Sequence, residues 1–320
     1  MTKKLFLAIL PFMLLTACGK ENTPDTPEDN DKVDYVFLAQ PAVAGVMSQK
    51  ESLKMYANVQ NDYKAKTNNL EITQASIFVK ASADNTAISS FLSMIKNDVT
   101  TLMADPETVL PAATSSLEAQ VVTGKLGGQV PLIAKLLKNG NSIGLGFKDA
   151  KTNKSAIDAF IGTLGLPNSN DNIYFEPNAS AVPSTTLDLN VACPAGAPAT
   201  AFYKYFSDSK MEVGNADTVV GYLSNNSNKD VVIAPTNAGI AAINKGAGYK
   251  LAATITFGNF FILSTGNDTD GVMNKGDKVL AFQEAGVPGK LFKYLYSDLE
   301  LDVTFLNDAA AVKNAVLTEQ

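Results

Sequence analysis

The chain has 320 residues, 46% of them hydrophobic, and a formal net charge of −6. The apolar content is enough for two α/β domains or one large one, and the negative charge disfavours nucleic acid or an anionic membrane surface as a partner. The sequence contains no His, Arg or Trp. It therefore lacks histidine-dependent catalytic dyads, histidine-ligated zinc sites and arginine forks for phosphate or carboxylate groups. No motif indicates a catalytic carboxylate pair, and we expect no catalytic residues, no metal and no cofactor.

The beginning of the chain reads as an export signal followed by a tether. Two lysines precede an apolar run from residue 5 to residue 15, which is too short to span a bilayer. The tetrapeptide Leu-Thr-Ala-Cys ending at Cys18 resembles a bacterial lipobox, so we expect residues 1–18 to be a lipoprotein signal and Cys18 to be lipidated. An ordinary signal peptide with an incidental cysteine is the alternative. Residues 19–32 alternate proline with acidic residues and predict a disordered tether.

Two segments that begin at Asp34 and Asp230 form an internal repeat. The stretch "DYVFLAQPAVAGVMSQKESLKMYANV" matches "DVVIAPTNAGIAAINKGAGYKLAATI", and Lys54 and Lys250 share the offset of 196 residues that separates the two aspartates. Each copy predicts a strand, a proline-containing loop, a helix of small residues and a second strand.

A second pair of matching segments begins at Leu189 and Val279. The stretches "LNVACPAGAPATAFYKYF" and "VLAFQEAGVPGKLFKYLY" place Gly196 and Gly286 at an offset of 90 residues. Each predicts a buried strand, an Ala-Gly-x-Pro turn and an amphipathic helix. Chance similarity between apolar segments is the alternative for either pair taken alone.

The order of these units indicates a circular permutation. In one copy the next unit starts 34 residues after Gly196, whereas in the other copy the chain ends 34 residues after Gly286. The missing next strand stands at the front, in residues 33–41. We predict that a helix in residues 309–320 leads structurally into that strand, and that the older chain ends are joined through residues 176–186. Permutations are tolerated where chain ends lie close together at a surface.

Read in the unpermuted order, the chain resembles the substrate-binding lipoproteins of ABC importers, in the branch that includes nitrate, sulfonate and thiamine-precursor binders. The resemblance lies in "LNVACPAGAPAT", "KDVVIAPTNAGIAAINKG", "YKLAATITFGNFFILSTG", "GDKVLAFQEAGVPGKLFKYL" and "VDYVFLAQPAV". The stretch "ITQASIFVKASADNTAISSFLSMIKNDV" looks like the strand that returns to the first lobe and its following helix. A Cys-Pro-Ala-Gly loop departs from the Gly-Pro-Thr type usual in relatives.

This resemblance implies an α/β, two-lobed type II periplasmic-binding-protein fold in circularly permuted order, with a ligand cleft between the lobes. Lobe 1 would comprise residues 73–276, and lobe 2 residues 33–72 plus 277–320. In open α/β sheets, ligands bind beyond the carboxyl ends of strands, at loops that lead into helices. The loops after the four repeated strands are such places.

We predict a ligand-binding site with two walls from these loops. One wall comprises Ala195, Gly196, Ala197, Thr200, Thr236 and Asn237, the other Gln40, Pro41, Gln283, Glu284, Ala285 and Gly286, and the segment "TFGNFF" adds Thr256, Asn259 and Phe260. Glycines let backbone N–H groups approach a ligand, while Thr and Asn side chains offer hydrogen bonds. Phe257 and Phe260 are candidates for stacking on a ligand.

Each candidate also has a purely structural interpretation. The glycines and prolines of the repeated turns could serve only to shape those turns, and Thr236 and Asn237 fit an ordinary helix start. The phenylalanines fit core packing, and Cys193 fits a small core residue better than a reactive thiol. Glu284 would either stabilise a helix dipole or, facing a cleft, favour a cationic ligand.

The resemblance implies binding without catalysis. The chain would be a monomeric extracytoplasmic lipoprotein, held at the bacterial membrane only through Cys18, that captures a small-molecule solute and presents it to an ABC permease. The absence of arginine favours a neutral, polar or aromatic solute. The alternative is a surface lipoprotein that keeps the same fold for adhesion, sensing or scaffolding. Fungal pyrimidine synthases resemble this fold too, but they depend on histidine, which this chain lacks.

Overall fold

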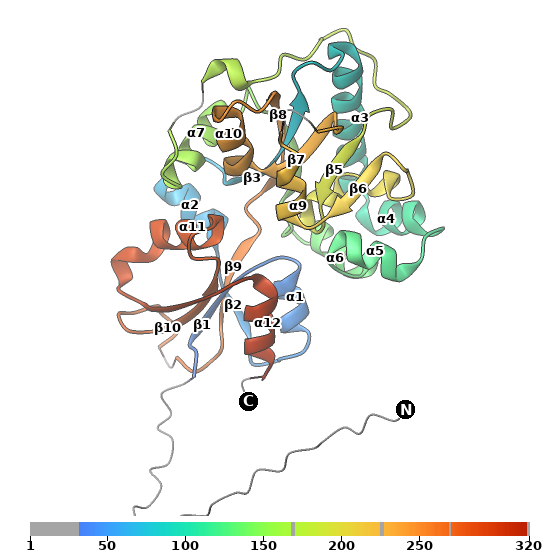
Figure 1. Ribbon diagram of the computed structural model, residues 1–320. Coiled ribbons are helices and arrows are strands. Elements are labelled where there is room, and N and C mark those ends of the chain that lie inside the picture. Colours follow the sequence, from blue (N-terminus) through green and yellow to red (C-terminus); the bar gives the residue numbers. More distant parts are fainter. Residues whose placement is uncertain (1–31, 168–169, 225–226, 269, 319–320) are drawn as a thin grey trace, which may run out of the picture. The chain divides into compact units, whose positions relative to one another are not determined.

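The computed structural model describes residues 32–167, 170–224, 227–268 and 270–318 (Figure 1). The predicted signal, the lipidation site at Cys18 and all but the last residue of the predicted tether lie outside these residues. The chain divides into two units after Lys32, and the unit that begins at Val33 is the one described below.

The first of its two sheets has five strands in the order β11-β10-β1-β9-β2. These strands are β1 (Tyr35–Ala39), β2 (Lys54–Asn58), β9 (Phe260–Ser264), β10 (Lys278–Phe282) and β11 (Asp302–Leu306). Strands β11, β10 and β1 are parallel neighbours, and β9 runs antiparallel to both β1 and β2. The helices of this part are α1 (Ala42–Met47), α2 (Val59–Lys66), α11 (Val287–Tyr296), the short 3-10 helix η4 (Ser297–Leu299) and α12 (Ala309–Thr318).

The second sheet has six strands in the order β4-β8-β3-β7-β5-β6. They are β3 (Thr73–Lys80), β4 (Leu145–Asp149), β5 (Val191–Pro194), β6 (Met211–Gly214), β7 (Val231–Pro235) and β8 (Tyr249–Phe257). Strands β6, β5 and β7 are parallel, and β3 runs antiparallel to β7 and β8. Successive β7 residues alternate between two buried apolar clusters, Ile233 in one and Val232 in the other, because successive side chains of a strand point to opposite faces. Both faces of this sheet are therefore covered.

Helices pack around the second sheet (Figure 1). They are α3 (Asn85–Ala104), α4 (Pro106–Thr114), α5 (Ala119–Leu126), α6 (Val130–Lys138), α7 (Lys154–Thr163), α8 (Ala197–Thr200), α9 (Ala216–Gly221) and α10 (Thr236–Asn244), with the 3-10 helices η2 (Asp171–Ile173) and η3 (Tyr203–Tyr205). Local signals start several of them. The side chain of Asp84 accepts a hydrogen bond from the Ala87 N–H at the start of α3, and Asn215 does the same for Thr218 in α9.

The two sheets share one plan. The order β11-β10-β1-β9-β2 corresponds to β6-β5-β7-β3-β8, with the same strand directions, and β4 is an addition at the edge of the second sheet. Across β1, β9 and β2, the paired residues are Tyr35, Ser264 and Lys54; across β7, β3 and β8, they are Val231, Val79 and Lys250. Tyr35 and Lys54 each lie 196 residues before their counterparts. The register therefore confirms the first internal repeat.

The repeated aspartates have the same role in both sheets. The Asp34 carboxylate accepts a hydrogen bond of 2.9 Å from the Lys278 N–H at the start of β10. The Asp230 carboxylate accepts one of 2.9 Å from the Asn190 N–H just before β5. Each aspartate thus ties the strand that follows it to the central parallel strand of its sheet.

Strand pairing corrects the predicted offset of the second repeat. Val279 pairs with Tyr35, and Val191 pairs with Val231, so Val279 is the counterpart of Val191 and the strand offset is 88 residues rather than 90. The predicted ungapped alignment is wrong for these strands, because the loop after β10 is two residues longer than the loop after β5. The following helices also differ: α11 has 10 residues, whereas α8 has 4 and is continued by the separate 3-10 helix η3.

The predicted α/β class is confirmed, since both sheets are mixed and helices pack beside them. Two segments pass between the sheets: α2 and the residues after it connect β2 to β3, and Gly258–Asn259 connect β8 to β9. Strand β9 pairs in the first sheet, although the sequence assigned residues up to 276 to lobe 1, whose strands form the second sheet. Within the described part of the chain, no helix combines the length and the apolar character needed to cross a membrane.

Candidate functional site

The predicted residues gather at the carboxyl ends of the parallel strands. Gln40 and Pro41 follow β1, Gln283 follows β10, Ala195 follows β5 and Thr236 follows β7. Since parallel strands end at one edge of their sheet, the topology brings each predicted wall to the edge where α/β proteins bind ligands.

The loop after β5 holds its residues in different ways. Gly196 has a left-handed backbone (φ +98°), which suits glycine, and its N–H donates a 2.9 Å hydrogen bond to the Lys125 carbonyl. Ala195 is exposed, but Ala197 is buried and Thr200 is fully buried with its hydroxyl 3.4 Å from the Gly196 carbonyl. Ala195 and Gly196 are thus accessible at the surface, whereas Ala197 and Thr200 pack beneath them.

Thr236 belongs to a buried chain of hydroxyl groups. Its Oγ1 lies 2.8 Å from the Ser76 Oγ, which lies 3.2 Å from the Thr254 Oγ1. Thr236 is the first residue of α10, and no side-chain hydrogen bond caps this helix. The neighbouring Asn237 Oδ1 is buried and has no hydrogen-bond partner.

Asn259 ties the crossing between the sheets to both of them. Its Nδ2 donates to the Gln40 carbonyl at 3.0 Å, and its backbone N–H donates to the Gln74 Oε1 at 3.3 Å. The Gln40 N–H in turn donates to the Asn259 carbonyl at 2.9 Å. Although Asn259 is only 3% exposed, its Oδ1 has no partner.

Three of the predicted residues therefore keep a buried oxygen without a partner: Asn237 Oδ1, Thr256 Oγ1 and Asn259 Oδ1. Strand register pairs Ala75 of β3 with Thr256 on one side and with Pro235, the residue before Thr236, on the other. Thr256 and Thr236 therefore lie near each other, where β8 and β7 end. A buried polar atom left without a partner costs about 1–3 kcal/mol. All three atoms accept hydrogen bonds, so a ligand or water with N–H or O–H groups would satisfy them.

The aromatic candidates are placed by packing. Phe260 is 2% exposed and stacks on Phe37 at 5.4 Å between ring centroids, within the core of the first sheet. Phe257 is half-buried, and the Lys148 Nζ lies 5.3 Å from its ring centroid. Core packing, the structural interpretation of these phenylalanines, accounts for Phe260. The ring of Phe257 already has the Lys148 ammonium as a cation–π neighbour.

Glu284 is exposed, and its Oε1 accepts a 2.6 Å hydrogen bond from the Lys293 Nζ. The carboxylate lies beside a pocket between α11 and β11 that Phe292 and Tyr296 also line. The Glu284 carboxylate is thus paired with a lysine of helix α11. Exposed pairs of this kind contribute little to stability.

The other residues of this loop shape its backbone. Gln283 has a left-handed backbone (φ +52°), and its N–H donates to the Leu306 carbonyl at 2.8 Å. The Gln283 carbonyl accepts a hydrogen bond from the Gly286 N–H at 2.9 Å. Ala285 is exposed between them. Backbone hydrogen bonds, within the loop and to Leu306, therefore hold this loop, and Gln283, Glu284 and Ala285 are exposed.

One contact was missed by the sequence analysis. Gly127, at the end of α5, lies so close to both predicted walls that a Cβ placed on it would be 3.2 Å from the Gly196 Cα and 3.5 Å from the Pro41 Cγ. A Cβ on Gly128 would lie 3.6 Å from the Pro41 Cβ. The Gly-Gly pair before a Val-Pro helix start signals a turn, but no local pattern indicates that this turn meets Pro41.

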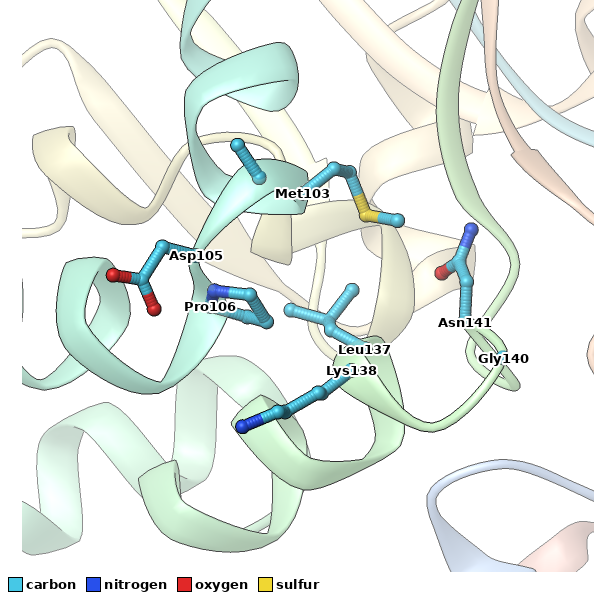
Figure 2. Close-up of a pocket in the computed structure, with 8 residues that line it drawn as sticks. Met103, Asp105, Pro106, Leu137, Lys138, Gly140 and Asn141 are labelled. Atoms are coloured by element: carbon cyan, nitrogen blue, oxygen red, sulfur yellow. The ribbon is translucent and has the colours of Figure 1, made fainter.

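A pocket of about 400 Å³ lies at the end of α3, the start of α4 and the end of α6, and none of the predicted site residues lines it. Figure 2 shows residues that line this pocket. Its polar side chains are engaged within the chain. The Asp105 carboxylate accepts a hydrogen bond from the Thr108 N–H at 3.3 Å, Lys138 pairs with Glu107, and both side-chain polar atoms of Asn141 bond to Leu145. We therefore do not take this pocket as the functional site.

Two titratable groups near the predicted walls are perturbed by burial. Burial raises the pKa of the Cys193 thiol, which keeps it protonated and unreactive. Burial lowers the pKa of Lys125, whose Nζ donates a hydrogen bond to the Phe206 carbonyl and lies 5.3 Å from the Phe206 ring centroid. The thiol is thus fully buried, and the lysine is held by Phe206.

The site thus offers amides, hydroxyls and backbone groups, which bind by hydrogen bonds. Among the residues that the structure describes, no cluster of three or more His, Cys, Asp or Glu could hold a metal ion. No protein-family model, curated protein or solved structure matches the chain.

Proposed function

We propose that this chain is an extracytoplasmic solute-binding lipoprotein with a circularly permuted, two-lobed fold of the type II periplasmic-binding-protein kind. It would capture a small neutral solute between its lobes, close by a hinge motion of the two crossing segments, and present the solute to an ABC permease. Binding would shift the population toward the closed form, because only that form contacts the solute from both walls.

The observation that carries this proposal is the shared plan of the two sheets. Strand order, strand direction and the 196-residue register agree, and two segments cross between the sheets. A cleft between two such units would be lined by the loops at their carboxyl edges, where the predicted residues lie. This is the arrangement that the sequence resemblance implies.

The chain order supports the permutation. In the second sheet the three parallel strands follow one another as β5, β6 and β7, whereas in the first sheet β10 and β11 stand near the end of the chain and β1 begins the unit. Helix α12 packs against β1 and β10 after β11, as α9 packs against β7 and β5 after β6. Helix α12 therefore lies beside β1 and β10 as α9 lies beside β7 and β5, which supports the proposal that it would lead into β1.

The polar groups of the site favour a neutral solute that donates hydrogen bonds. Glu284, the charged residue among the predicted contacts, is paired with Lys293. The unpartnered oxygens of Asn237, Thr256 and Asn259 would accept from N–H or O–H groups of the solute.

A thermal-melt screen tests the proposal. The chain from residue 19 onward would be melted with thiamine precursors, riboflavin-like compounds, purines, amino acids, nitrate and alkanesulfonates. A solute at 100 times its dissociation constant adds about 2.7 kcal/mol, enough to raise the midpoint by a few degrees. Neutral compounds that carry N–H groups are expected to give the shift. A cooperative melt that no solute shifts would contradict the proposal.

A surface lipoprotein for adhesion, sensing or scaffolding is the second candidate. The close approach of Pro41 to the Gly127–Gly128 turn favours it, because the two predicted walls meet there directly through protein atoms. Retention of one defined protein partner by a chain that binds no solute would select this function.

A further inference from the structure

Helix α7 is buried on two sides, and each side packs in the core of a different sheet. Ile157 and Ile161 lie in an apolar cluster of the second sheet, together with residues of β3, β7 and β8. Phe160 and the residue that ends the helix, Leu164, lie instead in the cluster of the first sheet. Phe160 and Ile161 are both fully buried. Adjacent residues of one helix therefore complete the cores of two sheets.

Two further contacts hold α7 to helices of the first sheet. The Phe160 ring packs edge-on against the Tyr63 ring of α2, with 6.4 Å between the ring centroids. The Lys290 Nζ of α11 donates a hydrogen bond of 3.1 Å to the Leu164 carbonyl, at the carboxyl end of α7. A lysine is favourable there, because the helix dipole places negative partial charge at this end. Figure 1 shows α11 beside both α2 and α7.

The joint between these helices is filled only in part. A pocket of about 470 Å³ lies between them, lined by Ala159 and Gly162 of α7, Tyr294 of α11 and Thr67 just after α2, among others. The apolar contact of α7 with the first core is therefore made by Phe160 and Leu164. Because it is confined to so few side chains, truncation of one of them should weaken the whole joint.

We propose that α7 is a clasp that couples the two sheets, a third connection beside the two chain segments that cross between them. This inference goes beyond the proposed function, because the clasp acts in the chain without a solute. Ile157 and Ile161 hold the helix on the second sheet, while Phe160 supplies part of the first core. Neither sheet unfolds, or turns away from the other at this joint, without disturbing the contacts of α7.

Urea unfolding followed separately in the two sheets tests the clasp. The full chain carrying Cys18→Ser, which cannot be lipidated, would be pulse-labelled with deuterium at increasing urea concentrations. Mass spectrometry would then follow one peptide from β1 and one from β7. We expect both peptides of the otherwise unmodified chain to show one midpoint, because coupled sheets unfold together.

Phe160→Ala breaks the clasp, and Phe282→Ala is its matched control. Phe282 is another buried phenylalanine of the same cluster, 6% exposed, but it belongs to strand β10 of the first sheet itself. The control should lower the midpoints of both peptides together. Phe160→Ala should place the β1 midpoint about 1 M urea below the β7 midpoint, because the first sheet loses both core packing and its link to the second.

Coincident midpoints in Phe160→Ala, as in the control, would overturn the clasp, and so would separate midpoints in the unmodified chain. This test does not depend on the melt screen. A chain that no solute stabilises but whose sheets separate only in Phe160→Ala would overturn the proposed function alone. A chain that a solute stabilises but whose midpoints stay together in Phe160→Ala would overturn the clasp alone.

If Phe160→Ala does not fold, Lys290→Met replaces it, with Lys293→Met as its control. Both lysines belong to α11, but Lys290 bonds to α7, whereas Lys293 pairs with Glu284 in the loop before its own helix. Lys290→Met should separate the two midpoints in the same direction by a smaller amount, and Lys293→Met should leave them coincident. Equal behaviour of the two lysine variants would contradict the clasp.

Discussion

The two sheets repeat one backbone plan but fill it with different side chains. In the second sheet, Gly239 of α10 lies directly against Phe78 of β3, and a Cβ on this glycine would be 1.9 Å from the Phe78 ring. By the 196-residue offset and the strand register, the equivalent positions in the first sheet are Val43 of α1 and Leu263 of β9. Glycine and phenylalanine in the second sheet thus stand where the first sheet has valine and leucine. The plan is thus preserved by compensating volumes rather than by shared residues.

The largest expected effect comes from breaking this compensation. Gly239→Val should lower the free energy of unfolding by about 3 kcal/mol, because the new side chain has no space beside Phe78. Urea denaturation would measure the loss. The double variant Gly239→Val with Phe78→Leu, which imitates the first sheet, should recover part of it.

Gly162→Ala in α7 is the control for this prediction, since a Cβ there meets no heavy atom within 4 Å. It should be neutral or slightly stabilising. If the Gly239→Val chain is as stable as the control, the small size of Gly239 does not compensate for the large Phe78 ring.

The repeated aspartates test whether the sheets are equivalent. Asp34→Ala and Asp230→Ala should each cost about 2 kcal/mol, because each leaves a strand-start N–H without its charged acceptor. Asn at the same positions, which keeps an acceptor oxygen, should cost less. If urea denaturation shows clearly unequal losses in the free energy of unfolding, the same hydrogen bond contributes differently to stability in the two sheets.

A smaller effect should appear at acid pH in the second sheet alone. Hydrogen bonds from Lys229 at 2.6 Å and Tyr222 at 2.7 Å lower the pKa of Glu212 on the edge strand β6. The equivalent position in β11 is Thr304, which has no charge. The folded state therefore binds fewer protons at Glu212 than the unfolded state, and this stability is present above the unfolded pKa and lost as pH falls through the lowered folded value.

Hydrogen exchange as a function of pH would measure this difference. Acidification should weaken the protection of β6 more than that of β11, and Glu212→Gln should reduce the pH dependence of β6. If the two edge strands lose protection in parallel in the unmodified chain, Glu212 is not the cause.

The smallest expected effect is that of rearranging the chain into the order that the proposed permutation implies. A chain in which a short Gly-Ser linker joins residue 320 to residue 33, opened between Ala181 and Val182, should fold with a stability within about 1 kcal/mol of the original. Val182 is 77% exposed, so the new ends disturb little packing. Circular dichroism and urea denaturation would measure the outcome. Failure of this chain to fold would contradict the proposed permutation.

Local patterns predicted much of the fold. The first repeat was recognisable because its aspartate, its apolar strand and its proline loop recur at one offset, and the register of β1 and β7 confirms it. The offset of the second repeat was wrong by two residues in the strand. Its glycines do lie 90 residues apart, but an insertion within the loop cannot be located until the strands are paired.

The positions of the candidate residues in the fold were predicted in part. The loops at the carboxyl ends of the parallel strands were identified, because the order of strands and helices determines which loops meet. The contact of Gly127 with Pro41 was missed, and so was the pairing of Glu284 with Lys293. The first joins positions far apart in the chain, and the second depends on how the loop after β10 turns back over α11.

The sequence by itself determined the elements of the repeated segments, the first repeat and the α/β class of this protein, because apolar periodicity, turn residues and repeated side chains act over a few neighbouring residues. Only the tertiary structure decided that β9 pairs with β1 and β2, that Gly239 leaves space for Phe78, and that a glycine turn from α5 joins the two predicted walls. These features depend on which surfaces meet after folding. Because protein interiors are closely packed, such contacts depend on the exact shapes of side chains that are far apart in the sequence, which a local pattern does not show.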